Sequence, residues 1–116
     1  MTPTADLGLS THVLNTSNGL PATDMLIRLE ILDGTAWREI DTARTDADGR
    51  ARGLSKGGLR TGDYRLNFAT GAWFAERAVE CFFPTVTIEF RVSDPKRHHH
   101  VPLLLSPFGY STYRGS

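Results

Sequence analysis

The chain has 116 residues, of which 40% are hydrophobic and 22% charged, a composition typical of one globular domain over residues 1–116. Its 13 basic and 13 acidic residues balance, which argues against nucleic acid or an anionic membrane as a partner. No apolar run approaches the roughly 18 residues of a membrane span. The N-terminal segment lacks the features of a secretory signal, so the given chain is expected to be cytoplasmic.

Most of the chain reads as short strands separated by turns. Apolar and polar residues alternate clearly in residues 25–33, and Asp33-Gly34 then predicts a hairpin. The expected strands span residues 8–15, 25–33, 37–46, 50–54, 62–70, 85–92, 97–106 and 110–115. Residues 72–83 alone have helical spacing, and Pro84 is expected to end that helix. This pattern indicates an all-β, antiparallel β-sandwich with one short helix.

The three consecutive histidines at 98–100 are expected to differ in orientation, because side chains alternate between faces along a strand. His99 shares a face with Val101, Leu103 and Leu105, which makes it a candidate core residue. The other face carries His98, His100, Pro102 and Leu104. An apolar outer face of this kind indicates burial against another subunit.

The same alternation predicts the outward residues of the first and last strands. With Leu9, Thr11 and Val13 inward, the outward residues of the first strand are Ser10, His12 and Leu14. In the last strand, Tyr110 and Thr112 point one way, and Ser111, Tyr113 and Gly115 point the other. If these strands are neighbours, one surface combines imidazole, phenol and apolar groups. Patterning alone leaves open whether that surface is an active site or an interface with incidental histidines.

Three segments carry a resemblance to a known family. They are LSTHVLN…GLPA (9–22), TDADGRARGL (45–54) and HVPLLLSPFGYSTYRGS (100–116). Together they resemble the 5-hydroxyisourate hydrolases, the transthyretin-related enzymes of urate breakdown, and the terminal Tyr-Arg-Gly-Ser distinguishes that family from transthyretin itself. The chain departs from the family at His99, where tyrosine is frequent, and at Asn15, where aspartate is common.

The resemblance implies a fold, an assembly and a reaction. The fold is a transthyretin-like (prealbumin) sandwich of two four-stranded sheets, and the assembly is a homotetramer, a dimer of dimers with active sites between the dimers. The reaction is hydrolysis of 5-hydroxyisourate, a small purine-derived substrate, without a cofactor or a metal. The alternative is a non-catalytic carrier of a small ligand, in the manner of transthyretin.

The resemblance also implies which residues act. The catalytic set falls on His12, Arg50 and His100. The substrate-binding set comprises His12, Arg50, Ser111, Tyr113, Arg114, Gly115 and Ser116, with His98 at the border of the cleft. Either His100 or His12 suits the role of general base, because imidazole titrates near neutral pH. Arg50 would stabilise developing negative charge, while Arg114 is either a substrate or inter-subunit contact or a solvated terminal charge.

A metal site is the chemical rival to this interpretation. His98 and His100 share a face, and His12 would add a third imidazole, as in catalytic zinc centres. However, the outward set contains no Asp, Glu or Cys, and Arg50 would repel a divalent cation. We therefore expect catalysis without a metal.

Overall fold

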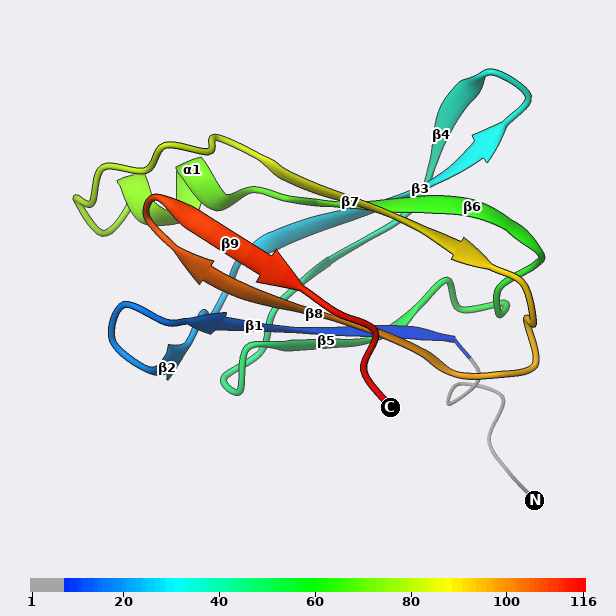
Figure 1. Cartoon of the computed structure of the whole chain (residues 1–116), viewed down its shortest axis with the longest axis horizontal. Coiled ribbons are helices and arrows are strands. Elements are labelled where there is room, and N and C mark those ends of the chain that lie inside the picture. The colour runs from blue at the N-terminus through cyan, green and yellow to red at the C-terminus, as the bar shows by residue number, and fades with distance from the viewer. Residues whose placement is uncertain (1–7) are drawn as a thin grey trace.

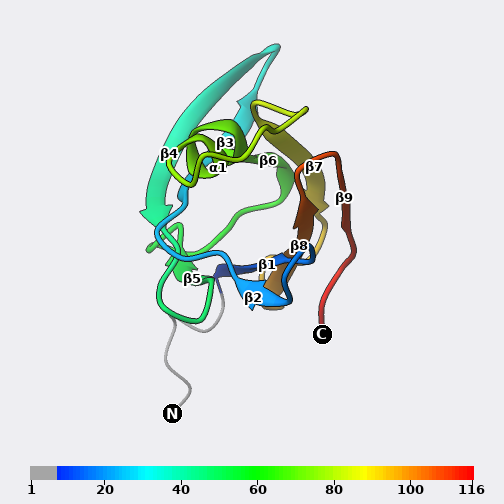
Figure 2. The same cartoon turned by 90° about the vertical axis from the view of Figure 1, so that its left-hand side faces the viewer.

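The computed structural model describes residues 8–116, which form two β-sheets packed face to face (Figures 1 and 2). The strands are β1 (Leu9–Asn15), β2 (Leu20–Pro21), β3 (Leu26–Asp33), β4 (Ala36–Arg44), β5 (Arg50–Leu54), β6 (Gly62–Phe68), β7 (Val86–Val92), β8 (His99–Ser106) and β9 (Gly109–Thr112), with one helix, α1 (Thr70–Ala75). Within residues 8–116, no helix has the length and apolarity needed to cross a bilayer.

The two sheets confirm the expected sandwich. One sheet has the order β4-β3-β6-β7, and the other has the order β2-β1-β8-β9 with β5 also paired to β1. The two-residue strand β2 is an addition to the expected four strands of that second sheet. Asp33 pairs with Ala36 across the predicted hairpin, and the intervening Gly34 has the positive φ of 67° that such a tight turn requires.

Strands β1 and β8 pair in parallel, whereas all other strand pairs described are antiparallel. Local patterning cannot reveal this exception, because the two strands come from opposite ends of the chain. The parallel register sets Ser10 opposite His100 and His12 opposite Pro102. This pairing therefore decides which side chains become neighbours on the outer face of the sheet.

The core between the sheets follows the predicted alternation. On β8 the inward residues His99, Val101, Leu103 and Leu105 are all buried, as are Leu9, Thr11 and Val13 on β1. Burying a leucine or valine side chain contributes about 1.5–3 kcal/mol. The periodicity of the two strands therefore fixes their outer faces as well, because a one-residue slip would expose the entire apolar set.

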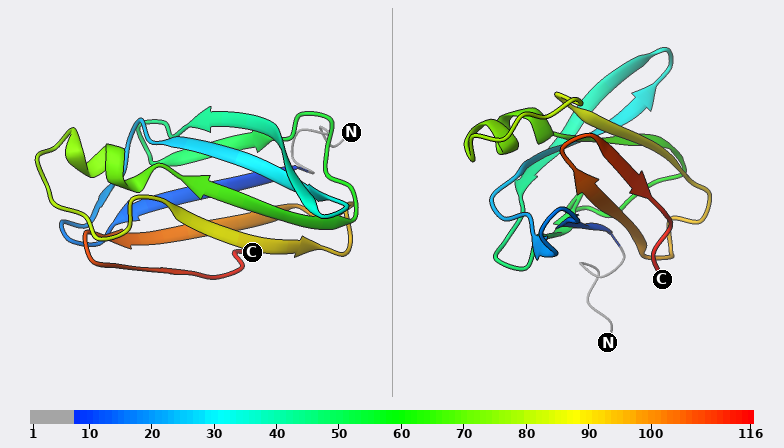
Figure 3. Two further views of the ribbon diagram at one scale, coloured as in Figure 1. Left: turned by 90° about the horizontal axis from the view of Figure 1, so that it is seen from above. Right: turned by 60° about the vertical axis from the view of Figure 1, so that its left-hand side comes forward.

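The helix is shorter than predicted and lies at one end of the sandwich (Figure 3). It ends at Ala75 rather than continuing to residue 83, and Ala78 has a left-handed φ of 57°. Beyond it, the amide of Phe82 donates to the carbonyl of Pro107 at 2.8 Å. Tertiary contact with the β8–β9 turn thus overrides the helical spacing, while Trp73 and Phe74 are buried in the core.

The last strand is also shorter than the predicted span 110–115. Strand β9 ends at Thr112, whose hydroxyl donates to the carbonyl of Pro102 at 2.6 Å. Gly115 then makes an isolated bridge to His100. The C-terminal residues therefore return to β8 beside the histidine that the sequence singles out.

Candidate active site

Three strands of one sheet bring the expected catalytic residues to its outer face. Arg50 lies at the start of β5 directly opposite His12 of β1. Two residues earlier on β1, Ser10 lies opposite His100 of β8. The charge of Arg50 and the ring of His12 both act on the titration of His100. The structure thus brings together all three expected residues.

A tight turn fixes the start of β5 and with it the position of Arg50. The carboxylate of Asp46 accepts the amides of Asp48 at 2.8 Å and Arg50 at 3.0 Å, and these hydrogen bonds help to lower the pKa of Asp46. Gly49 has φ +76°, and a Cβ there would lie 2.5 Å from the carbonyl oxygen of Val13. Only glycine fits this close approach to β1 without strain.

Ser10 links two of the three consecutive histidines. Its hydroxyl oxygen lies 2.8 Å from Nε2 of His98 and 2.8 Å from Nδ1 of His100. Ser10 itself is buried, whereas the neighbouring His98 is exposed. Alternation correctly predicts that Ser10 faces outward, but it assigns the residue no function. The sequence does not reveal the register between β1 and β8. That register places Ser10 beside histidines that are 88 and 90 positions away in the chain.

The surroundings of His100 favour its neutral form. Burial lowers its pKa most, and the cationic Arg50 lowers it further, followed by His98 and His12. A hydrogen bond with the backbone of Ser10 acts in the opposite direction. The net effect is a pKa below the ordinary value of 6.5, so His100 is largely neutral at pH 7.

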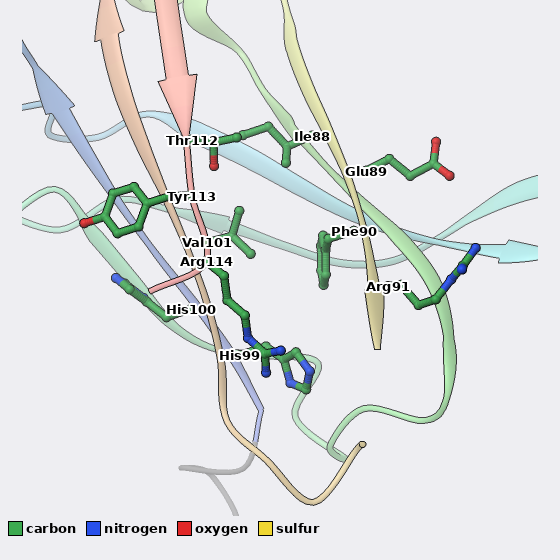
Figure 4. Close-up of a pocket in the computed structure, with 10 residues that line it drawn as sticks. All are labelled: Ile88, Glu89, Phe90, Arg91, His99, His100, Val101, Thr112, Tyr113 and Arg114. Carbon is green, nitrogen blue, oxygen red and sulfur yellow. The ribbon is translucent and has the colours of Figure 1, made fainter. Parts of the chain in front are cut away.

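The C-terminal segment packs against His100. The Gly115 amide donates to the carbonyl of His100 at 2.9 Å. Tyr113 is exposed, with its side chain on the same side of β8 as His100 (Figure 4), and Ser116 is exposed as well. Ser111 pairs with Leu104 in register, which sets it further along the same sheet. Gly115 therefore lies against His100, whereas Ser111 lies beside Leu104.

Arg114 points away from this group. Its side chain runs toward the ring of His99 (Figure 4), and its charge helps to lower the pKa of His99. Both residues line a cavity of about 330 Å³ between β7 and the ends of β8 and β9. The apolar part of its wall includes Ile88, Phe90 and Val101. In residues 8–116, Arg114 is therefore closer to the inner, filler histidine than to the catalytic candidates.

The candidate histidines lie beside groups that disfavour a bound metal ion. Within the described part of the chain, no group of three or more His, Cys, Asp or Glu side chains is arranged to hold a metal ion. His98 and His100 share a hydroxyl partner through Ser10. The cation Arg50 stands beside His12, where it would oppose a bound dication.

A two-sheet sandwich with this strand order defines a transthyretin-like protein. The family model described as HIUase/Transthyretin family matches residues 9–115, and the chain belongs to that family. It is 45% identical to the 5-hydroxyisourate hydrolase of Caulobacter vibrioides, over 94% of this chain and 98% of that protein.

Solved structures share the fold. The 5-hydroxyisourate hydrolase of Klebsiella pneumoniae has a TM-score of 0.84 and 40% identity, covering 93% of this chain and 98% of that one. Sea bream transthyretin in complex with thyroxine has a TM-score of 0.86 but 28% identity, covering 92% and 93% of the two chains. The fold is therefore common to a hydrolase and to a transthyretin that binds thyroxine, and the side chains on the outer face must distinguish them.

Proposed function

We propose that this protein hydrolyses 5-hydroxyisourate to 2-oxo-4-hydroxy-4-carboxy-5-ureidoimidazoline in purine catabolism. The main support for the proposal is that His12, Arg50 and His100 lie on the same face of one sheet in a chain that belongs to this family. The 45% identity to a hydrolase over nearly the full length of both chains supports it further. A cytoplasmic location stays a prediction from the sequence.

The reaction adds water across the lactam C6–N1 bond. In the proposed mechanism His100 is the general base, since its neutral imidazole is available at pH 7. It removes a proton from water as the oxygen attacks C6. The tetrahedral oxyanion then collapses, the C6–N1 bond breaks, and the proton passes from His100 to N1. The six-membered ring opens and the enzyme returns to its starting state.

Arg50 and His12 complete the proposed catalytic set. A guanidinium cannot act as a base at neutral pH, so Arg50 stabilises the developing oxyanion or an anionic edge of the substrate. His12, directly opposite Arg50, orients the substrate. Tyr113 stacks on the flat heterocycle or donates its hydroxyl to it. Ser111, Gly115 and Ser116 line the far side of the site.

The proposed active form is a homotetramer, a dimer of dimers, with each active-site cleft between two dimers. The outer face of β8 supports this assembly, because it carries the half-buried apolar side chain of Leu104 on the same face as His100. Leu20 and Phe108 are large apolar side chains that are 60% and 64% exposed on the same sheet and its connecting turn. Covering this face would exclude water from the site and strengthen its electrostatics.

Ultraviolet absorbance tests the function directly. Freshly generated 5-hydroxyisourate decays spontaneously, and the protein should accelerate that decay and favour one enantiomer of the product. His100→Asn should abolish most of the acceleration while the assembly measured by light scattering is unchanged. His12→Asn, tested in parallel, separates the base from the orienting histidine.

Two results would count against the proposal. Near-normal turnover by an intact His100→Asn assembly would remove His100 from the mechanism. No acceleration by the folded wild-type protein would favour a ligand carrier over an enzyme, and direct binding of an aromatic ligand would then be measured.

Activity that survives exhaustive chelation would exclude a required metal.

A further inference from the structure

The hydroxyl of Ser10 lies between two imidazole rings and has only one proton to share. Its oxygen is 2.8 Å from Nε2 of His98 and 2.8 Å from Nδ1 of His100. A serine hydroxyl donates one hydrogen bond and accepts others. When its own proton lies in one of these two hydrogen bonds, the hydroxyl donates to one ring and accepts an N–H from the other, and the direction of this chain determines which nitrogen of neutral His100 carries the proton.

The two directions have opposite chemical consequences. If Ser10 donates to Nδ1 of His100, the neutral ring is protonated on Nε2 and has no free lone pair facing the substrate. If His100 donates from Nδ1, Ser10 passes its own proton to Nε2 of His98, and Nε2 of His100 keeps its lone pair. Only the second direction leaves His100 able to act as a general base.

The local backbone favours the second direction. Ser10 is only 8% exposed, so bulk water does not readily replace its hydroxyl. The backbone of Ser10 also makes a hydrogen bond that raises the pKa of His100, as expected for an acceptor facing a ring N–H. This acceptor stabilises a proton on the side of the ring that faces β1, whereas the burial of Ser10 preserves the hydrogen-bond chain without setting its direction.

We propose that Ser10 and His98 are positioning residues that hold His100 in its Nδ1–H tautomer, so that Nε2 serves as the general base. The hydrogen-bond chain runs from His100 Nδ1–H to Ser10 Oγ and from Ser10 Oγ–H to His98 Nε2. This inference rests on the proposed function for the reaction, although the tautomer itself is independent of the substrate.

The same chain stabilises the charged intermediate state. When His100 Nε2 accepts the proton of water, the ring becomes cationic, and its Nδ1–H remains hydrogen-bonded to Ser10. Charge-assisted hydrogen bonds are roughly twice as strong as neutral ones. Arg50 on β5, His12 on β1 and His98 before β8 all disfavour that cation. Ser10 therefore supplies the compensating acceptor, and no proton has to leave the His98–Ser10–His100 chain during turnover.

Matched variants separate this role from simple packing. Ser10→Ala removes the hydroxyl, whereas Ser10→Thr keeps it on a residue that β-strands favour. His98→Leu removes the acceptor for the Ser10 proton, whereas His98→Gln places an amide oxygen near the position of Nε2. We expect Ser10→Ala and His98→Leu to lower kcat about 10- to 100-fold with little change in KM, as for other residues that orient a functional histidine. Ser10→Thr and His98→Gln should recover most of that loss.

Nitrogen NMR of labelled protein gives a readout that does not need substrate. The wild-type spectrum should show neutral His100 protonated on Nδ1, and Ser10→Ala should show a mixture or the Nε2–H form. A wild-type Nε2–H tautomer would overturn the inference, as would full kcat in Ser10→Ala with the wild-type tautomer. If wild-type protein fails to accelerate 5-hydroxyisourate decay but keeps the Nδ1–H tautomer and its dependence on Ser10, the proposed function fails and the positioning chain stands.

Discussion

The backbone of Gly115 lies directly against the imidazole ring of His100. The Gly115 amide donates to the carbonyl of His100 at 2.9 Å. A Cβ added to Gly115 would overlap Cδ2 of the ring and lie 3.0 Å from its Cγ. The glycine of the terminal Tyr-Arg-Gly-Ser is therefore needed for space, because the chain must pass the ring at this distance. This contact explains physically why a glycine follows Arg114 in this chain.

Gly115→Ala should impair catalysis without unfolding the domain. The new methyl group must displace either the His100 ring or the C-terminal segment, and a shift of about 1 Å at a reacting group can cost about 100-fold in rate. We expect kcat to fall by at least about 10-fold in the decay assay, with an unchanged circular dichroism spectrum. Gly109→Ala is the matched control, because a Cβ there meets nothing closer than the Ser106 hydroxyl at 3.7 Å. Equal activity of the two variants would contradict a positional role for Gly115.

Arg50→Gln should move the acid limb of the pH–activity profile to higher pH. The positive charge of Arg50 lowers the pKa of His100, second only to burial. Removing that charge raises the pKa toward 6.5, so a larger fraction of His100 is protonated and inactive at a given pH. NMR titration of His100 should show the same upward shift, and kcat should also fall because oxyanion stabilisation is lost.

Two further variants separate charge from geometry at this position. Arg50→Lys keeps the charge but not the planar fork, so the His100 titration should stay near wild type while activity falls. Arg52→Gln removes an equal charge two residues along β5, where the guanidinium is exposed and acts on Asp46. An unchanged His100 pKa in Arg50→Gln would show that the charge of Arg50 does not contribute to its titration.

Strand faces could be predicted from the sequence because they depend on a local period of two. The inward residues 99, 101, 103 and 105 of β8 are buried as predicted, and so are Leu9, Thr11 and Val13 of β1. The helix over 72–83 was overpredicted, because its spacing is also local but its C-terminal half is held by contact with the distant Pro107. Where a tertiary contact competes with a weak propensity, the contact prevails.

The candidate site was likewise only partly predictable from the sequence. Motif resemblance was sufficient to name His12, Arg50 and His100, and the structure brings them to one face. Ser10 could be placed on that face but not between two histidines, because this requires the parallel register of β1 and β8. Arg114 also lies beside His99, a contact that depends on the chain leaving the strand after Thr112.

His99→Phe should reduce the loss of stability that the protein undergoes at acidic pH. His99 is 5% exposed, its Nδ1 has no hydrogen-bond partner within residues 8–116, and burial lowers its pKa, with Arg114 adding to the effect. The unfolded chain therefore binds a proton near pH 6.5 that the folded chain takes up only at lower pH. Wild-type stability should fall as the pH drops below 6.5 and level off below the folded pKa.

Thermal unfolding at pH 7.5 and pH 5.5 measures this effect. The decrease in Tm between the two conditions should be smaller for His99→Phe, while a residual decrease remains because the pKa of His100 is lowered in the same direction. At pH 7.5 the stability of the variant should stay near that of the wild type, since phenylalanine removes the unpaired Nδ1 but also the hydrogen bond of His99 with the backbone of Arg97. Identical decreases in both proteins would show that His99 is not a source of acid sensitivity.

Glu30→Gln should weaken the β4-β3-β6-β7 sheet and leave catalysis unchanged. Its carboxylate accepts hydrogen bonds from Nε of Arg65 at 2.6 Å and Nδ2 of Asn67 at 2.5 Å, and Arg65 is the main cause of its lowered pKa. A carboxyl whose folded pKa is lowered stabilises the protein above its ordinary value of 4.5, and this stabilisation disappears as the pH falls through the folded pKa. The side chains are partly exposed, so we expect the free energy of unfolding to be about 1 kcal/mol lower in the variant at pH 7. This difference from wild type should disappear at acidic pH.

Urea unfolding at pH 7 and pH 3 measures this difference, and the decay assay at pH 7 measures activity. Glu39→Gln is the control, because its ion pair with Arg28 spans 3.6 Å between two side chains that are each more than half exposed. Solvent screens such a pair, so this variant should change stability less than Glu30→Gln. Since Glu30 lies on the sheet opposite to β1, β5 and β8, kcat should stay at the wild-type value. A loss of turnover in Glu30→Gln with an intact assembly would show that the two sheets are coupled in a way that their separate faces do not suggest.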